Sequence, residues 1–342
     1  GSQRRAGKMK KVALVTGILG QDGGYLAKLL LEKDYQVFGL SRRYSNPNFS
    51  NLEYLGVADK VEYISGDMTD EASLINIIKL IRPQEVYNLA AQSFVGASWD
   101  QPELTTEVNA LGPLYLLNAI RHHSPTSKFY QASTSEMFGN SHDNGLQTEE
   151  TPFHPRSPYA IAKLYAYWIA NNFKESYGLF CSNGILFNHE SPIRGIEFVT
   201  RKITDGVARI KFGLNKTIAL GNLDSRRDWG FAGDYVEAMW LMMQQEKPDN
   251  YIVSTGTTHS IREFLDLAFA TAGIKDWSEF VKIDPRFKRP AELFVLQGRS
   301  DKARKALGWK PKVQFKELVE MMVAADLERQ KGNLKQNTAQ HR

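Results

Sequence analysis

The chain has 342 residues, 42% of them hydrophobic and 24% charged, a composition typical of a globular protein and a length beyond one small core. Part of the net charge of +5 lies in the first eleven residues, so it argues only weakly for nucleic acid and suits an anionic small ligand equally well. No apolar run is long enough to span a membrane, and the single cysteine, Cys181, excludes an intrachain disulfide and fits a cytoplasmic setting. We interpret residues 1–9 as a cloning remnant, residues 1–8, followed by the native start, Met9.

The first half of the chain alternates strand-like and helix-like segments. Short apolar and β-branched runs predict strands at residues 11–16, 36–40, 61–65, 85–89, 128–132 and 181–186. Helical spacing of apolar residues predicts helices at 22–33, 71–81 and 108–122. This alternation predicts an α/β fold, a Rossmann-type doubly wound parallel sheet with right-handed crossovers.

The character of the sequence changes after about residue 188. Shorter strands are predicted at 217–220 and 250–254, and Ser260 with Glu263 forms a capping-box pattern before an apolar run. A last helix is predicted over 315–328, followed by a polar, frayed tail. We therefore expect a dinucleotide-binding domain over 10–187, a smaller α/β substrate-binding domain over 188–328 with some return to the first core, and a tail over 329–342.

A glycine-rich turn follows the first predicted strand. Gly17, Gly20 and Gly23 lie three residues apart and lead directly into a helix. Glycines permit a tight turn and close backbone approach to a pyrophosphate, and a helix N-terminus favours the negative charge. The sequence therefore predicts a dinucleotide site.

The end of the second predicted strand indicates which dinucleotide binds. NAD-binding proteins usually place an acidic residue there, whereas this chain has Arg42 and Arg43. Two guanidinium groups suit a 2′-phosphate, so NADP is the predicted cofactor. The alternative is that both arginines lie in a solvated basic turn.

Tyr159 and Lys163 are candidate catalytic residues. They follow Ser157 and Pro158, a pair typical of a helix start, and their spacing puts both on one helix face. A nearby ammonium lowers the pKa of a phenol, so we expect Tyr159 to act as a base and Lys163 also to hold the cofactor.

Thr134 and Glu136 follow the fifth predicted strand, at the sheet edge where ligands bind in such folds. The Thr134 hydroxyl can orient a substrate oxygen toward Tyr159. Glu136 is more informative, because simple oxidation or epimerisation needs no further carboxylate, whereas proton removal beside a ketone does. The alternative is that Glu136 is a surface glutamate in a loop.

Longer strings, which span residues 10–328, resemble GDP-mannose 4,6-dehydratases of the extended short-chain dehydrogenase/reductase family. They include Gly17-x-x-Gly20-Gln21-Asp22-Gly23, Asn88-Leu-Ala-Ala-Gln92-Ser93, Gln131-Ala-Ser-Thr-Ser-Glu136, Asn188-His-Glu-Ser-Pro192, Phe198-Val-Thr-Arg-Lys202, Asp224-Ser-Arg-Arg227-Asp-Trp-Gly230 and Arg289-Pro-Ala-Glu292.

The resemblance implies a three-step dehydration of GDP-mannose. Tyr159 would take the C4 hydroxyl proton while hydride passes to NADP. Glu136 would take the C5 proton as water leaves C6, and the hydride would return to C6. The product would be a 4-keto-6-deoxy sugar, made for deoxysugar biosynthesis by a homotetramer.

The resemblance also implies the binding residues. Nucleotide phosphates need cations, and a carboxylate can accept hydrogen bonds from ribose or guanine. Besides the glycines and arginines already named, the implied cofactor contacts are Gln21, Asp22, Asp67, Met68, Leu89, Ala90, Ser93, Tyr159, Lys163, His189 and Arg194. The implied GDP-sugar contacts are Ser93, Asn188, Lys202, Arg227, Arg289 and Glu292.

Several alternatives stay open at this point. A nucleotide-sugar epimerase or reductase shares the expected fold, and GDP-D-glycero-D-manno-heptose is an alternative substrate. A catalytically dead dinucleotide sensor is disfavoured because Thr134, Glu136, Tyr159 and Lys163 are all present. No nucleic-acid partner, membrane or metal site is expected.

Overall fold

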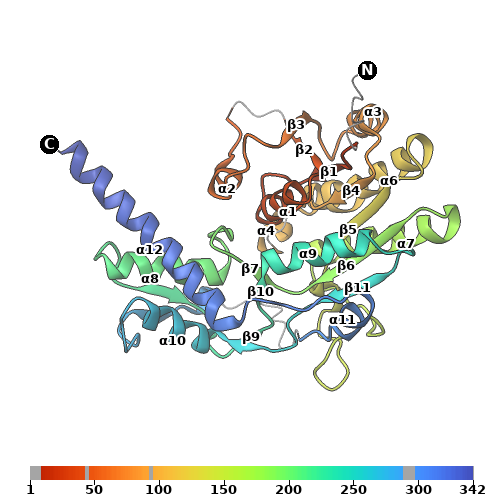
Figure 1. Ribbon diagram of the computed structural model, residues 1–342. Coiled ribbons are helices and arrows are strands. Elements are labelled where there is room, and N and C mark those ends of the chain that lie inside the picture. The colour runs from red at the N-terminus through yellow and green to blue at the C-terminus, as the bar shows by residue number, and fades with distance from the viewer. Residues whose placement is uncertain (1–8, 43–45, 92–94, 288–296, 342) are drawn as a thin grey trace.

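A computed structural model of the protein describes residues 9–42, 46–91, 95–287 and 297–341. At its centre is a seven-stranded sheet in the order β11-β6-β5-β4-β1-β2-β3, and every strand pair in it is parallel (Figure 1). The strands are β1 (Val12–Thr16), β2 (Gln36–Ser41), β3 (Glu62–Ser65), β4 (Glu85–Asn88), β5 (Lys128–Thr134), β6 (Cys181–Leu186) and β11 (Asn250–Val253). The expected Rossmann-type fold is confirmed, and β11 completes the sheet from the second half of the chain.

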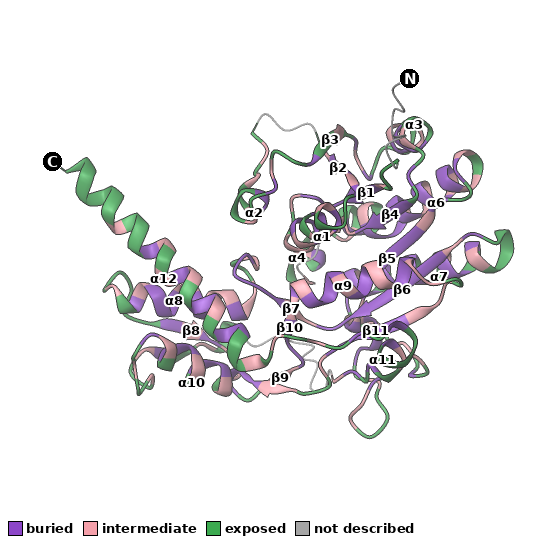
Figure 2. Cartoon of the chain, viewed as in Figure 1, coloured by how far each residue is buried: buried purple, intermediate pink, exposed green. Residues whose placement is uncertain are grey.

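Helices cover both faces of this sheet. Successive side chains of a strand point to opposite faces, so Ala13 and Val15 pack with one set of helices and Leu14 with the other. The central strands β1, β4, β5 and β6 are almost entirely buried, whereas the edge strand β3 has no buried residue (Figure 2). The first set includes α1 (Gln21–Glu32) and α9 (Ala232–Met243), and the second includes α3 (Glu71–Ile81), α6 (Gly112–His123) and α7 (Pro158–Tyr177).

The expected helix over 108–122 differs in its first turn. It begins with the π-helical turn η1 (Glu107–Leu111) and continues as α6. Pro113 near the start of α6 has no N–H, so it cannot make the regular hydrogen bond to the residue four positions earlier. The short elements nearby are α2 (Ser50–Tyr54), α4 (Val95–Asp100), α5 (Pro102–Thr106) and the 3-10 helix η2 (Ser135–Phe138).

A smaller unit with its own hydrophobic core lies at one end of the molecule (Figure 1). Its helices are α8 (Val199–Lys211), α10 (Ile261–Thr271) and α12 (Phe315–Gln340), packed around the paired strands β8 (Ile218–Leu220) and β13 (Val281–Ile283). The connecting elements are β7 (His189–Glu190), β9 (Arg226–Arg227), β10 (Gly230–Phe231), β12 (His259–Ser260), η3 (Pro285–Phe287) and α11 (Asp301–Leu307).

The start of α10 follows the sequence prediction in part. The Ser260 hydroxyl accepts a hydrogen bond from the Glu263 N–H at 3.1 Å, which confirms the expected N-cap. The Glu263 carboxylate instead pairs with Arg226 and His259, and so joins α10 to β9 and β12.

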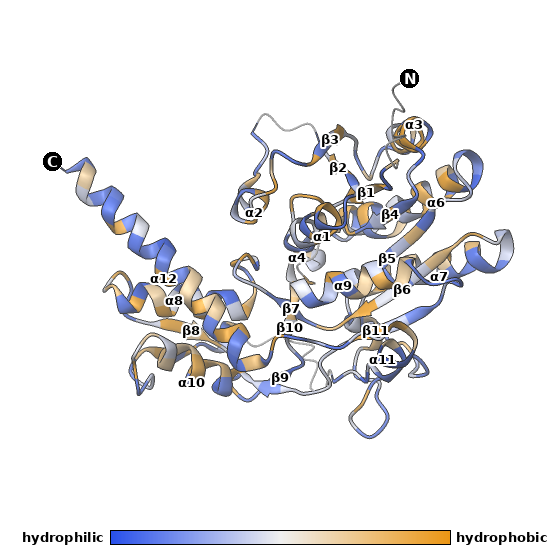
Figure 3. Ribbon diagram, in the orientation of Figure 1, coloured by the Kyte–Doolittle hydropathy of each residue, from blue (hydrophilic) through white to orange (hydrophobic). Residues whose placement is uncertain are grey.

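The predicted end of the last helix is wrong. The helix α12 does not stop at Glu328 but continues to Gln340. Arg329 donates to Asp326 and to the Pro192 carbonyl, and the buried Gln330 donates to Asp205. These contacts stabilise the turn that was expected to fray, while the final turns are hydrophilic and project from the body (Figure 3).

Candidate functional site

A cavity of about 540 Å³ lies where the carboxyl ends of the sheet strands meet the smaller unit. This volume is within the range of small-molecule sites. The large sheet and its helices contribute Asp22, Leu89, Thr134, Glu136, Tyr159 and Lys163 to the lining. The segments after β6 contribute Asn188, His189, Arg194, Lys202 and Arg227. The structure thus brings together eleven of the side chains expected from the sequence.

The glycine loop beside this cavity has little room for side chains. Gly17 has a φ of +69°, and a Cβ there would lie 2.8 Å from the backbone of Leu89 and Ala90. A Cβ on Gly23 would overlap the Gly17 carbonyl. Gly20 meets no atom closer than 3.4 Å and gives the start of α1 no side-chain cap. The loop therefore presents an accessible helix N-terminus, which fits the pyrophosphate of a dinucleotide.

The loop is tied to the neighbouring strands by polar side chains. The Thr16 hydroxyl accepts hydrogen bonds from the Leu89 and Ala90 N–H groups, both at 3.0 Å. Gln21 accepts from the Ser191 hydroxyl at 2.7 Å and donates to the His189 carbonyl at 3.2 Å. These bonds hold the glycine loop against the ends of β4 and β7.

Three of the expected cofactor contacts, Arg42, Asp67 and Met68, do not line the cavity. Arg42 Nε lies 3.3 Å from Asp67 Oδ2, so the ends of β2 and β3 are joined by an ion pair. Met68 is buried against Gly112 in the core rather than presented to solvent. Arg43, whose position was predicted to help choose NADP, lies outside the described residues.

The start of α7 places the two candidate catalytic side chains. Ser157 accepts a hydrogen bond from the Ala160 N–H at 3.0 Å, and Pro158 is the first helical residue. Tyr159 and Lys163 follow one turn apart and are both buried. Lys163 Nζ donates to the Ala132 carbonyl at 3.0 Å, which fixes α7 against β5.

The expected lowering of the Tyr159 pKa by Lys163 is wrong. Burial and then the negative charge of Glu136 raise the pKa of Tyr159, and Thr134 and Arg194 offset this only in part. Burial also lowers the pKa of Lys163 to about 8, and its Nζ lies 5.9 Å from the Tyr159 ring centroid. Tertiary burial therefore outweighs the ammonium effect expected from the spacing.

Thr134 and Glu136 stand where β5 passes into η2. The Thr134 hydroxyl oxygen accepts from the Glu136 N–H at 3.2 Å and so caps η2. Its own hydrogen is therefore available for donation toward Tyr159 or a substrate. Glu136 is half-buried and lines the cavity, which is not the environment of a surface loop glutamate.

The candidate sugar-nucleotide residues lie on the smaller unit's side of the cavity. Lys202 Nζ lies 3.8 Å from the Phe287 ring centroid, and burial lowers the pKa of Lys202. Arg227 Nη1 donates to the Arg226 carbonyl at 2.7 Å, and Asn188 lies between β6 and β7, two residues after Leu186. Ser93, Arg289 and Glu292 lie outside the described residues.

Several charged and aromatic lining residues were not among the expected site residues. Glu190, Phe198 and Trp229 lie within strings quoted for the family resemblance, so position in those strings was the available signal. Phe287 looks like a core residue in the sequence, because an aromatic side chain carries no charge to mark a site. These further lining residues include Glu190, Phe198, Trp229, Arg286 and Phe287.

Two kinds of feature are absent from the described part of the chain. None of its helices is both long and apolar enough to cross a membrane. In the same residues, no group of three or more His, Cys, Asp or Glu side chains could hold a metal ion.

Known proteins resemble this chain over nearly its whole length. The sequence model described as GDP-mannose 4,6 dehydratase matches residues 14–322. GDP-mannose 4,6 dehydratase 1 of Arabidopsis thaliana is 53% identical over 333 residues, covering 94% of this chain and 91% of the relative.

Solved structures resemble the fold. RMD from Pseudomonas aeruginosa, solved with NADPH, has a TM-score of 0.78 at 25% identity, covering 94% of this chain and 99% of that chain. UDP-glucose 4-epimerase from Thermus thermophilus, solved with NAD, has a TM-score of 0.80 at 28% identity, covering 92% and 98%. The fold is thus shared with other activities, whereas the family model and the far higher identity are those of dehydratases. The chain belongs to the GDP-mannose 4,6-dehydratase family.

Proposed function

We propose that the protein is a hydro-lyase that converts GDP-D-mannose to GDP-4-keto-6-deoxy-D-mannose. The observation that carries this proposal is a carboxylate, Glu136, in the same cavity as Tyr159 and Thr134. Oxidation of a hydroxyl needs only a Tyr159-type base, whereas loss of water also needs a group that removes the C5 proton. Membership of the dehydratase family supports the same reaction.

Tyr159 takes the proton of the C4 hydroxyl, and Thr134 orients that hydroxyl. Lys163 is anchored to β5 through the Ala132 carbonyl, so it holds α7 and Tyr159 in register with Thr134. Glu136 then removes the C5 proton, which the neighbouring C4 ketone acidifies, and delivers a proton to the departing C6 hydroxyl. A single carboxylate can do both, because the proton that it gains is the one that the leaving group needs.

NADP is the proposed cofactor. Bound at this site, it would accept hydride from C4, return it to C6 while the proton held by Tyr159 passes to C5, and supply a positive charge that favours the Tyr159 phenolate. The glycine loop fits a pyrophosphate, and Arg42 takes the place of the acidic residue usual in NAD sites. The structural neighbour from Pseudomonas aeruginosa was solved with NADPH.

In this proposal the two parts of the chain bind mainly different ligands. Residues 10–187 hold the dinucleotide, together with His189 and Arg194, which also line the cavity. Residues 188–328 hold the GDP-sugar through Asn188, Lys202 and Arg227, all of which line the cavity, and through Arg289 and Glu292. Cations suit the diphosphate, because charge-assisted hydrogen bonds to phosphate are strong.

We also propose a homotetramer. Two exposed aromatic residues on α7, Tyr165 and Trp168, lie beside exposed Ile161, and α4 and α5 add Trp99 and Leu104. Since α4 and α5 both pack on α7, these side chains form one apolar face, which is typical of a subunit interface. The single cysteine supports a cytoplasmic location.

Product mass tests the proposed activity. Incubation with GDP-mannose should give a product that has lost one water, with no net consumption of NADP. An epimerase would give a product of unchanged mass, and a reductase would consume reduced cofactor in proportion to product. Either result would overturn the dehydratase assignment.

A further inference from the structure

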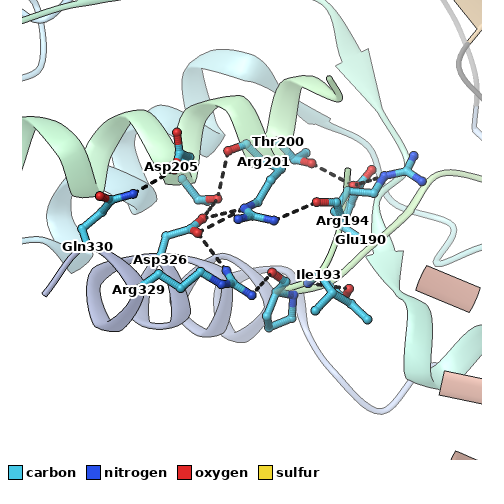
Figure 4. A network of polar contacts seen from close by, with 12 residues as sticks. Glu190, Ile193, Arg194, Thr200, Arg201, Asp205, Asp326, Arg329 and Gln330 are labelled. Atoms are coloured by element: carbon cyan, nitrogen blue, oxygen red, sulfur yellow. Dashed lines mark hydrogen bonds and ion pairs between the residues drawn. The ribbon is translucent and has the colours of Figure 1, made fainter. Parts of the chain in front are cut away.

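The side chain of Asp326 on α12 is a fully buried carboxylate that faces α8 (Figure 4). Arg201 Nε donates to its two oxygens at 3.1 and 2.9 Å, and the Thr204 hydroxyl donates at 2.7 Å. Arg329 Nη1 adds a fourth contact at 2.8 Å. A buried charge is costly unless it is paired in this way, so the two guanidinium groups are held in fixed orientations.

Both arginines extend beyond Asp326 to the same turn of the chain. Arg201 Nη1 donates to the Arg194 carbonyl at 2.9 Å, and Arg329 Nη2 donates to the Pro192 carbonyl at 2.7 Å. This turn lies between β7 and α8 and belongs to no helix or strand. The Asp326 carboxylate therefore orients two arginine side chains that donate hydrogen bonds to two backbone carbonyls of this irregular turn.

The side chain of Arg194 leaves this turn toward the cavity. Its Nε lies 2.7 Å from Glu190 Oε2, and its guanidinium carbon lies 3.6 Å from the Phe198 ring centroid. The Thr200 hydroxyl donates to the same Glu190 oxygen at 2.8 Å. Figure 4 shows the guanidinium end of Arg194 pointing away from Arg201 and Asp326. The backbone of Arg194 is thus fixed by one arginine while its side chain is fixed by Glu190 and Phe198.

We propose that Asp326 is a positioning residue for cofactor binding, acting through Arg201 and Arg329 on the turn that carries Arg194. The inference rests on the proposed function, in which Arg194 contacts the dinucleotide. It assigns the C-terminal helix, more than a hundred residues along the chain from this turn, a role in retaining the cofactor. Loss of either arginine–carbonyl hydrogen bond lets the turn move. The cofactor then dissociates faster, since changes at a binding site act mostly on the dissociation rate.

The test compares variants of the two arginines that hold the turn with a matched control. Arg329→Met removes the donor to Pro192, and Arg201→Lys removes the donor to Arg194 while keeping a charge beside Asp326. The control is Arg209→Met, which breaks the ion pair between Arg209 and Asp205 on α8 and touches no carbonyl of the turn. The two arginines are changed in place of Asp326, because Asp326→Asn would leave two arginines beside a neutral group and could unfold the protein.

The readout is the rate at which NADPH leaves the diluted holoenzyme, followed by its fluorescence well below the unfolding temperature. Both variants should release the cofactor about tenfold faster than the control, measured at a temperature at which all the proteins remain folded. Arg329→Lys, which keeps a donor, should restore part of the retention. Release rates within twofold of the control would overturn the inference. A wild-type protein that binds no dinucleotide would instead refute the cofactor assignment, and the inference with it.

Discussion

His189 Nε2 lies 2.5 Å from Asp22 Oδ2, and the other ring nitrogen of His189 lies 2.8 Å from the Phe187 carbonyl oxygen. A carbonyl only accepts, so Nδ1 carries a hydrogen, and the carboxylate favours a second hydrogen on Nε2. Burial lowers the pKa of His189, but the charge and hydrogen bond of Asp22 outweigh it and raise that pKa. The pair therefore favours an imidazolium beside the carboxylate of the glycine loop, where a pyrophosphate would otherwise meet a negative charge.

This pair predicts a pH dependence of stability. The folded pKa of His189 is raised, so its contribution is present below about pH 6.5 and is lost as pH rises through the folded pKa. Burial raises the pKa of Asp22, but His189 and Arg194 outweigh it and lower that pKa, so loss on the acid side occurs below the usual Asp range. Asp22→Asn should remove the alkaline fall, which we expect to be about 1–3 kcal/mol.

Denaturant unfolding of wild type and Asp22→Asn at pH 6 and pH 8.5 measures this difference. Lys163, whose pKa burial lowers to about 8, also titrates in this window, and the Asp22 charge raises that pKa, so the same comparison is repeated with Lys163→Met in both proteins. The pairing is refuted if both proteins lose the same free energy of unfolding between the two pH values.

Substitutions of Glu136 and Tyr159 should block different steps of the reaction. Glu136→Gln should lower dehydration by about 10²–10⁴-fold, the usual contribution of a general acid–base group, while substrate-dependent reduction of the cofactor remains. Tyr159→Phe should abolish that reduction as well, because it removes the first base. Stopped-flow absorbance of the reduced cofactor and product mass distinguish the two.

Glu197→Gln is the matched control for this pair, since Glu197 also lines the cavity but is exposed. It should retain wild-type turnover. Wild-type turnover in Glu136→Gln would contradict the assigned proton transfer.

Arg42 predicts the choice between NADP and NAD. Arg42 follows β2 and forms an ion pair with Asp67, and we expect its guanidinium to lie near the 2′-phosphate of NADP. Arg42→Ser should weaken NADP binding by about tenfold or more, as for loss of one hydrogen bond to a charged group, with NAD binding little changed. Identifying the nucleotide that is released when the wild-type protein is denatured provides a separate check of the cofactor. Finding NAD alone would refute the assignment of NADP.

The sequence predicted local features well and distant contacts poorly. The helix start at Ser157 and Pro158 was predictable because a cap depends on residues within one turn. The end of α12 was not, because the Arg329 contact with Pro192 joins residues far apart in sequence. Likewise the i and i+4 spacing put Tyr159 and Lys163 on one face, but the Tyr159 pKa depends on burial and on Glu136 from another element.

The apolar face of α4, α5 and α7 predicts how subunits associate. Trp168 is 56% exposed on α7, so burying it against another subunit would stabilise an assembly. Trp168→Glu should shift the protein to a smaller species in light scattering at micromolar concentration. Leu80→Glu is the control, because Leu80 is 78% exposed on α3, outside that face. A wild-type monomer, or equal effects of both substitutions, would refute the proposed interface.

The sugar itself is the last prediction, and GDP-mannose is expected to be preferred over GDP-D-glycero-D-manno-heptose. The two differ by one hydroxymethyl group at C6, beyond the atoms that Tyr159 and Thr134 contact, so the chemistry does not distinguish them. Selectivity must come from space at the C6 end, where one extra carbon changes the free energy of transition-state binding by about 1–3 kcal/mol. We expect residues 92–95 and the stretch around Glu190 to form that end, and of these Val95 and Glu190 line the cavity. We therefore expect a higher kcat/KM for GDP-mannose, and Val95→Ala should narrow the difference by enlarging the cavity. Rates for both sugars, measured with both proteins, decide the matter. A wild-type preference for the heptose above about tenfold would overturn the choice of sugar and leave the dehydration chemistry standing.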